Sequence, residues 1–334
     1  MKNLNVMAPI NSLGYGVASL NTLINLRNFF DIALFPIGNN QEVAQIFPQE
    51  VARAPMFDAG APCLKIWHEF EVDEFNDQKK HHLAQCEKVI TSCQWAADIV
   101  RKEVTDSNVF VAPLGVDRTI FYNNRESQPT EKFILFNCGK WEVRKGHDVM
   151  LEIFQRAFPD NADVELWMMC QNPVANPEYN QKWNNYYMQD PRVRLLNRCN
   201  THKELSDIMR SVSCGFFPSR AEGWNLELLE MMSCGKPVVT TDYSAHTEFC
   251  TDENSYKVKP KSLEKAFDGM YFREEDKGNW ASLKGIENDL VEALREVYEQ
   301  WKKDGDVVNK EGIKTAQNMS WAVTANKVKE AINA

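Results

Sequence analysis

The sequence predicts an α/β protein of two domains, each built on a doubly wound parallel sheet with helices on both faces. Short apolar runs rich in β-branched and aromatic residues alternate with longer helical patterns, as in βαβ units. The chain has 334 residues, which is more than one hydrophobic core usually serves. A polar stretch with a proline, at residues 123–132, separates two series of such runs. These observations together favour two doubly wound domains.

The predicted strands follow one another in two sets. The first set occupies residues 4–8, 32–36, 63–67, 89–91 and 109–111, and the second occupies residues 133–138, 164–169, 193–196, 214–217 and 238–241. From Gly285 onward the pattern is helical only. We therefore predict a first domain at residues 1–124, a second at 125–315, and a C-terminal helix at 316–334 that crosses back toward the first domain.

The composition is that of a soluble globular protein, with 43% hydrophobic and 25% charged residues. The net charge of −9 disfavours a broad nucleic-acid or anionic-membrane surface. No segment approaches the ~20 uncharged residues of a membrane span, and the N-terminus lacks a signal-peptide core. The nine cysteines form no Cys-x-x-Cys pair and lie mostly in apolar runs, which is typical of reduced core thiols. We expect a cytoplasmic protein.

The first candidate site is the glycine-rich turn NSLGYGVASL, at residues 11–20, between the opening strand and a helix predicted to start near Val17. Gly14 and Gly16 would let the backbone approach an anion or a polar substrate at the helix N-terminus. A turn of this kind also occurs for purely structural reasons. No acidic residue follows the second strand to complete a dinucleotide fingerprint, so NAD is not expected.

A second candidate is His68, in LKIWHEFEVDEF at residues 64–75. It ends a predicted strand, and ligands of open α/β sheets bind at the carboxyl ends of strands. The alternative is a histidine that caps a helix or lies in a loop.

The third candidate is the turn in FILFNCGKWEVRKGHDVML, at residues 133–151. Gly139 ends the strand, and Lys140, Arg144 and Lys145 follow before an amphipathic helix. Three cations at one strand-to-helix junction would repel one another unless an anion lies there, and phosphate is the best candidate. A solvated basic turn is the alternative.

The fourth candidate is FPSRAEGWNLELLEMMSCGKPVV, at residues 217–239. Asn225 is placed to cap a helix from Leu226 to Ser233, which leaves Glu222 in the loop before it. Glu230 then lies on an otherwise apolar helix, where an ionised carboxylate is costly unless donors surround it. Those donors could be a lysine or arginine, or the paired hydroxyl groups of a ligand.

No metal site is expected. Asp242, His246 and Glu248 follow a predicted strand, but their spacing fits none of the usual zinc patterns. The Asp-Gly-Asp sequence at residues 304–306 lies between helices, far in sequence from the other candidates, and indicates a loop.

Taken together, these stretches resemble the retaining nucleotide-sugar glycosyltransferases of family four, which have the GT-B fold of two facing Rossmann-like domains. The resemblance covers nearly the whole chain and rests on motifs in a fixed order, above all Glu-x7-Glu before a Cys-Gly-Lys-Pro turn. The matching stretches are GYG, WH, VITSCQWAADIV, VAPLGVDRTIF, GKWEVRKGHD, FPSRAEGWNLELLEMMSCGKPVV and the SW at residues 320–321.

The resemblance implies a role for each candidate. His68, Lys145 and Glu222 would be catalytic, with Glu222 at the donor sugar and Glu230 at the nucleotide ribose. Lys140 stands where the family usually has arginine, so a point charge replaces a bidentate fork. The implied donor-binding residues are Gly14, Gly16, Gly139, Lys140, Lys145, Glu222, Gly223, Trp224, Asn225, Leu226 and Glu230.

The implied reaction is glycosyl transfer with retention from a nucleoside diphosphate sugar, without a metal or a cofactor. The acceptor would be a glycan, a lipid-linked glycan, a protein or a small molecule bound by the N-terminal domain. A modified DNA base is disfavoured by the acidic total, although QKKHH at residues 78–82 could form a local basic patch. A peripheral position at the inner membrane face fits a lipid-linked acceptor. The alternatives are a nucleotide-sugar epimerase and a degenerate sugar-binding or scaffold protein on the same fold.

Overall fold

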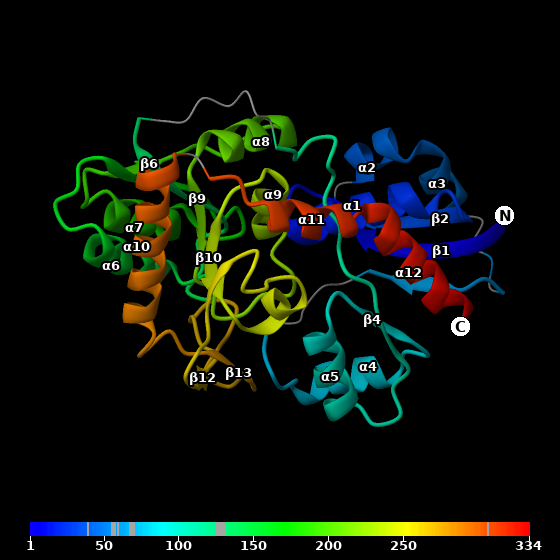
Figure 1. Cartoon of the computed structure of the whole chain (residues 1–334). Coiled ribbons are helices and arrows are strands. Elements are labelled where there is room, and N and C mark those ends of the chain that lie inside the picture. Colours follow the sequence, from blue (N-terminus) through cyan, green and yellow to red (C-terminus); the bar gives the residue numbers. More distant parts are fainter. Residues whose placement is uncertain (39, 55–57, 59, 67–70, 124–130, 306) are drawn as a thin grey trace. The chain divides into compact units, whose positions relative to one another are not determined.

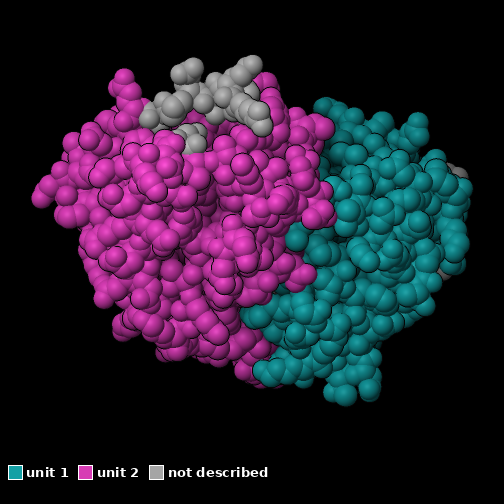
Figure 2. Space-filling model, in the orientation of Figure 1, with its two compact units in different colours: residues 1–70, 82–115, 319–334 teal, residues 71–81, 116–318 magenta. Residues whose placement is uncertain are grey.

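The computed structural model describes residues 1–38, 40–54, 58, 60–66, 71–123, 131–305 and 307–334 (Figure 1). The chain divides into two compact units, coloured separately in Figure 2. Unit 1 comprises residues 1–70, 82–115 and 319–334, and unit 2 comprises residues 71–81 and 116–318. No helix in these described ranges is long and apolar enough to cross a membrane.

Unit 1 contains a parallel sheet in the order β2-β1-β3 and a parallel pair, β4-β5. Its strands are β1 (Lys2–Pro9), β2 (Phe30–Ile37), β3 (Cys63–Lys65), β4 (Val89–Thr91) and β5 (Val109–Val111). Its helices are α1 (Gly14–Leu26), α2 (Asn40–Ile46), α3 (Pro48–Arg53), α5 (Gln94–Glu103) and α12 (Trp321–Asn333), while α4 (Asp77–Ala84) has residues in both units. The C-terminal helix α12 packs on α1 and adds Ala325 and Val328 to the core formed around β1.

Unit 2 is built on six parallel strands in the order β11-β10-β9-β6-β7-β8. They are β6 (Phe133–Gly139), β7 (Val164–Cys170), β8 (Val193–Leu195), β9 (Cys214–Phe217), β10 (Val238–Thr241) and β11 (Tyr256–Val258). The antiparallel pair β12 (Leu263–Lys265) and β13 (Asn279–Ala281) follows. The helices are α6 (His147–Ala157), α7 (Pro177–Tyr187), α8 (His202–Ser211), α9 (Leu226–Ser233), the 3-10 helix η2 (Ser244–Glu248), α10 (Glu287–Asp304) and α11 (Lys310–Asn318).

The helices of unit 2 lie on both faces of its sheet, with α6 against α10 on one face and α9 against α11 on the other (Figure 1). The inner strands β6 and β9 are buried along their whole length except at Gly139, as expected for parallel strands covered on both sides. Aromatic and aliphatic side chains from β6, β7, α6 and α10 form the largest part of the core.

The strand predictions are confirmed. Each of the ten predicted strands is present, although the run at 63–67 ends at Lys65 within the described residues. The predicted start of the first helix near Val17 is wrong, because α1 begins at Gly14. A Cβ atom on Gly16 would lie 2.4 Å from Asn11 Oδ1 and 2.5 Å from the Asn11 backbone, so this glycine is needed for the tight entry into α1.

Candidate functional site

The sheet of unit 2 has a topological switch point between β6 and β9. From β6 the chain proceeds to β7 and β8 on one side, and it then returns to β9 and proceeds to β10 and β11 on the other. Open parallel sheets bind ligands outside the carboxyl ends of the strands at such a point. The segments that leave these ends are residues 139–146 after β6, 218–225 after β9 and 242–246 after β10. Most of the predicted site residues lie in these segments.

Two glycines with positive φ shape the turn after β6. Gly139 has φ +140°, and a Cβ atom there would lie 3.3 Å from Lys145 Cε. Gly146 has φ +79° and forms the N-cap of α6. A Cβ atom on Gly146 would lie 2.3 Å from the Pro218 carbonyl oxygen, so the turn packs directly on the segment that leaves β9. The two glycines thereby bring Lys145 and the loop after β9 together.

We expect Gly146→Ala to destabilise unit 2 by about 2–4 kcal/mol, since it combines a left-handed backbone with a clash against a carbonyl group. Gly285→Ala is the matched control, because Gly285 has φ +86° but no atom of the described structure within 4 Å of its Cβ position. That control isolates the backbone penalty, which is about 1 kcal/mol. Urea unfolding of both variants measures the difference, and equal losses would contradict the packing role of Gly146.

The predicted cations after β6 are paired with carboxylates of the protein itself, and two of them, Arg144 and Lys145, are buried. Arg144 is 3% exposed, and its guanidinium contacts Glu222 Oε2 at 2.7 Å, Glu142 Oε2 at 2.6 Å and Glu71 Oε1 at 3.0 Å. Lys140 Nζ lies 2.6 Å from Glu142 Oε1. The alternative of a solvated basic turn is therefore wrong for Arg144 and Lys145, and so is the premise that the three cations have no anion within the chain.

Glu222 is the centre of this network. Its Oε1 accepts hydrogen bonds from Lys145 Nζ at 3.0 Å and Ser219 Oγ at 2.8 Å, and its Oε2 accepts one from Arg144. Burial raises the pKa of Glu222, but the attraction of Arg144 and Lys145 outweighs burial and holds the pKa well below its usual range. Glu222 is therefore ionised, and Lys145, whose own pKa is raised in return, is charged.

The loop from Glu222 to α9 is held by side chains from the segment after β10. Asn225 has φ +81° and caps α9, because its Oδ1 accepts from the Leu228 N–H at 3.2 Å. Its Nδ2 then donates to His246 Nε2 at 2.9 Å. The Nδ1–H of His246 donates to the Thr241 carbonyl at 3.0 Å, and burial lowers the pKa of this imidazole, so His246 is neutral. His246 thus acts in positioning Asn225.

Glu230 lies on α9, as predicted, and is 8% exposed. No described residue donates a hydrogen bond to its carboxylate, and no described lysine or arginine is paired with it. Burial, together with the neighbouring Glu227, raises the pKa of Glu230 well above its usual range. The protein therefore supplies no internal partner for this acid in its described parts.

The other predicted donor-binding residues have different environments. Trp224 is buried, with its ring centroid 5.0 Å from that of Phe249, and its Nε1 has no acceptor among the described residues. Leu226 is buried at the start of α9. Gly14 and Gly16 lie in the first turn of α1 in unit 1, and His68 lies outside the described residues.

The sequence analysis missed the carboxylates that neutralise the cations. Glu142 lies between Lys140 and Arg144 in the sequence KWEVRK, and this alternation of charge could have indicated internal pairing. Glu71 had no such signal, because it is 73 positions away from Arg144 in the chain (144 − 71) and reaches it only through the fold. Ser219 was also missed.

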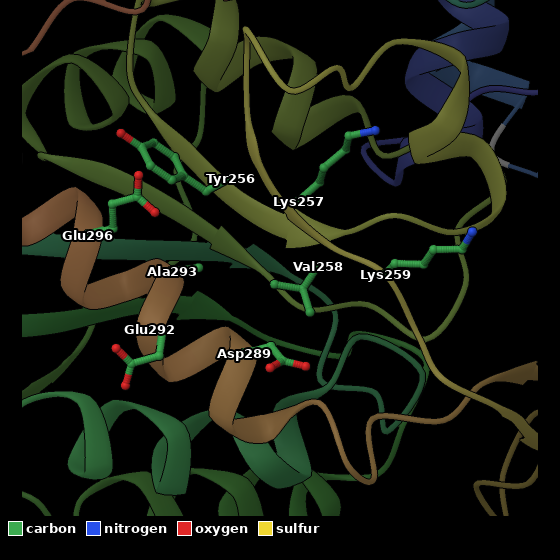
Figure 3. A pocket seen from close by; sticks show the side chains of 8 residues that line it. All are labelled: Tyr256, Lys257, Val258, Lys259, Asp289, Glu292, Ala293 and Glu296. Carbon is green, nitrogen blue, oxygen red and sulfur yellow. The ribbon is translucent and has the colours of Figure 1, made fainter.

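Beyond the switch point, the described residues form a surface pocket and no metal site. No group of three or more histidine, cysteine or acidic side chains in the described ranges is arranged to hold a metal. A surface pocket of about 490 Å³ lies between β11 and α10, where Tyr256 and Glu296 face each other (Figure 3). None of the predicted site residues lines this pocket. Its lining residues are Tyr256, Lys257, Val258, Lys259, Asp289, Glu292, Ala293 and Glu296.

Comparison with known proteins relates this chain to glycosyltransferases. Residues 132–271, which contain most of the site, match the family described as glycosyl transferases group 1. An uncharacterized glycosyltransferase of Methanocaldococcus jannaschii is 26% identical over 199 residues, which are 56% of this chain and 52% of that protein. The chain thus spans about half the length of the curated relative that it matches.

Solved structures show the same fold over the full chain. HepE of Anabaena, in complex with UDP-glucose, has a TM-score of 0.71 at 11% identity and covers 100% of both chains. Sucrose-phosphate synthase of Thermosynechococcus elongatus has a TM-score of 0.69 at 14% identity, covering 99% of this chain and 98% of that one. The predicted fold class, GT-B with parallel sheets and C-terminal helices, is confirmed.

Proposed function

We propose that this protein, a GT-B chain whose residues 132–271 match the group 1 glycosyl transferases, transfers a glycosyl group from a nucleoside diphosphate sugar to an acceptor hydroxyl. One observation carries the proposal. An ionised carboxylate held by Lys145 and Arg144 occurs at the switch point of the sheet together with a buried carboxylate, Glu230, that has no partner among the described residues.

Glu230 is proposed to bind the ribose of the nucleotide. An acid that is buried without a donor is costly, and the vicinal hydroxyl groups of ribose would supply two donors to one carboxylate. HepE, whose solved complex contains UDP-glucose, supports a nucleotide sugar as the donor. The base and the sugar would be selected by other contacts.

Lys140 and Lys145 are proposed to bind the diphosphate. In the reaction, the bond between the anomeric carbon and the diphosphate oxygen breaks, a bond from the acceptor oxygen to the anomeric carbon forms, and the proton of the acceptor hydroxyl passes to the departing diphosphate oxygen. Negative charge grows on the leaving diphosphate, and fixed cations stabilise it without a divalent metal. Glu222, which orients Lys145, would contact the sugar. Retention at the anomeric carbon follows from the resemblance of the Glu-x7-Glu motif to the retaining family.

Binding and turnover test the proposal in turn. Thermal unfolding in the presence of UDP-, GDP-, ADP- and dTDP-sugars is expected to show one nucleotide that raises Tm, because a ligand bound to the folded state stabilises it. Release of the nucleoside diphosphate from that donor then measures reaction. Failure of every nucleotide to stabilise the protein would contradict the proposed donor.

We expect Glu230→Gln to stabilise the free protein by about 1 kcal/mol and to weaken nucleotide binding, because the amide removes a buried charge but replaces one of the two acceptor oxygens with a donor. Since the pKa of the folded Glu230 is raised, the wild type loses stability as pH rises through the window above the ordinary glutamate pKa. The variant lacks this loss. Thermal unfolding at several pH values and nucleotide titration measure both effects.

The matched control for Glu230→Gln is Glu292→Gln on the exposed surface of α10. It is expected to change neither the pH dependence of Tm nor nucleotide affinity. Glu230→Ala should weaken nucleotide binding more than Glu230→Gln does, because the amide oxygen still accepts one hydrogen bond. Equal nucleotide affinity in the wild type and both Glu230 variants would rule out the ribose assignment.

A further inference from the structure

The Lys140 ammonium is held from two sides. Its side chain is 26% exposed, which makes it the most accessible of the three cations after β6. Lysine is a flexible point charge without the planar fork of arginine, so its direction depends on its neighbours. Glu142 Oε1 lies 2.6 Å from Nζ on one side, and the ring of Tyr271 lies 5.0 Å from Nζ on the other.

Tyr271 is itself fixed at both ends. It lies in the loop between β12 and β13, where Asp268 Oδ1 accepts three backbone N–H groups, from residues 270, 271 and 272. The phenol hydroxyl donates to Asn172 Oδ1 at 3.1 Å. Asn172 is fully buried, and its Nδ2 donates to the carbonyl of Trp141, the residue after Lys140, at 3.2 Å. The ring is therefore anchored to the same turn that carries Lys140.

The remaining hydrogen-bonding capacity of Lys140 points to a ligand. An ammonium has three N–H donors, of which Glu142 takes one and the Tyr271 ring faces another. The third has no acceptor among the described residues. A phosphate oxygen is an acceptor of the right charge for it.

We propose that Tyr271 is a positioning residue for donor binding, whose ring holds the Lys140 ammonium toward the diphosphate of the nucleotide sugar. This inference rests on the proposed function, in which Lys140 contacts that diphosphate. The aromatic ring compensates for the missing guanidinium fork by fixing the direction of a single charge. Its hydroxyl serves only to hold the ring through Asn172.

Nucleotide titration of Tyr271 variants tests this role. The probes are UDP, GDP, ADP and dTDP, and Kd is measured calorimetrically for the one that binds most tightly. Tyr271→Leu is expected to weaken binding about fivefold. Tyr271→Phe keeps the ring and is expected to weaken it by less than about twofold. In a Lys140→Met background, Tyr271→Leu should cause no further loss, because its effect passes through Lys140.

Phe267→Leu is the matched control, since Phe267 is an aromatic residue 52% exposed in the same connection between β12 and β13. It should leave Kd unchanged. An unchanged Kd in Tyr271→Leu, with a loss in Lys140→Met, would overturn this inference and leave the proposed function intact. Additive losses in the double variant would also overturn it. An unchanged Kd in Lys140→Met would overturn the phosphate role of Lys140 as well.

Discussion

Replacing Glu222 by glutamine is expected to slow glycosyl transfer by about two to three orders of magnitude, while the nucleoside diphosphate binds more tightly. The carboxylate pairs with Lys145 at 3.0 Å and with Arg144 at 2.7 Å, so it competes with a diphosphate for Lys145. The amide removes that competition and frees positive charge for the nucleotide. It also removes the charge proposed to act at the sugar, where the chemical step occurs. Release of the nucleoside diphosphate and calorimetric titration measure the two effects.

The prediction is specific because the transfer rate is expected to fall while the affinity for the nucleoside diphosphate is expected to rise. A variant that merely unfolds would lose both transfer and nucleotide affinity. Glu264→Gln is the matched control, because Glu264 also pairs with a buried arginine, Arg220, at 2.8 Å, but lies on β12 and is not paired with Lys140, Arg144 or Lys145 in the described structure. Its transfer rate should stay near that of the wild type. Transfer at the wild-type rate in Glu222→Gln would contradict a role for this carboxylate at the sugar.

Local sequence was sufficient to predict the central sheets. The strands of unit 2 from β6 to β10 are short apolar runs between amphipathic helices. Because a strand buried on both faces needs apolar residues along nearly its whole length, such runs can be recognised in the sequence. The strands β11, β12 and β13 were not predicted. The residues of β12 include Leu263, which is 49% exposed, and two charged residues, so no apolar pattern distinguishes them from a loop. The pairing with β13 comes from the fold.

The site was predicted as far as single segments allow. The cap at Asn225 and the helix that carries Glu230 follow from local preferences and were confirmed. The ion pair between Arg144 and Glu222 joins residues 78 positions apart and depends on β9 lying beside β6. Neither segment by itself specifies which strands lie side by side in the sheet. The sequence therefore indicated which charges were present but could not show that they neutralise one another.

Arg144→Met is expected to destabilise unit 2 by about 3–5 kcal/mol, because it leaves buried carboxylates without their common partner. The guanidinium contacts Glu71, Glu142 and Glu222, and the last two are almost fully buried. For a unit of this size the loss corresponds to a fall in Tm of about 6–20 °C. Urea and thermal unfolding at neutral pH measure it.

The pH dependence shows whether unpaired carboxylates cause that loss. Burial raises the pKa of Glu142 and of Glu222. Arg144 and the nearby lysines lower both pKa values by more than burial raises them, so the net shift is downward. A lowered pKa in the folded state gives stability that is present above the ordinary glutamate pKa and lost as pH falls through the folded value. The deficit of Arg144→Met should therefore be largest at neutral pH and shrink in acid.

Arg220→Met is the control for Arg144→Met. Asp148 and Glu264 are about one third exposed and can be solvated when Arg220 is removed, so this variant should lose less stability. Adding Glu142→Gln to Arg144→Met should restore part of the stability, since it removes a buried carboxylate that has lost its guanidinium partner and retains only Lys140. A deficit that is independent of pH, together with no rescue by Glu142→Gln, would show that Arg144 acts through packing and not through its charge.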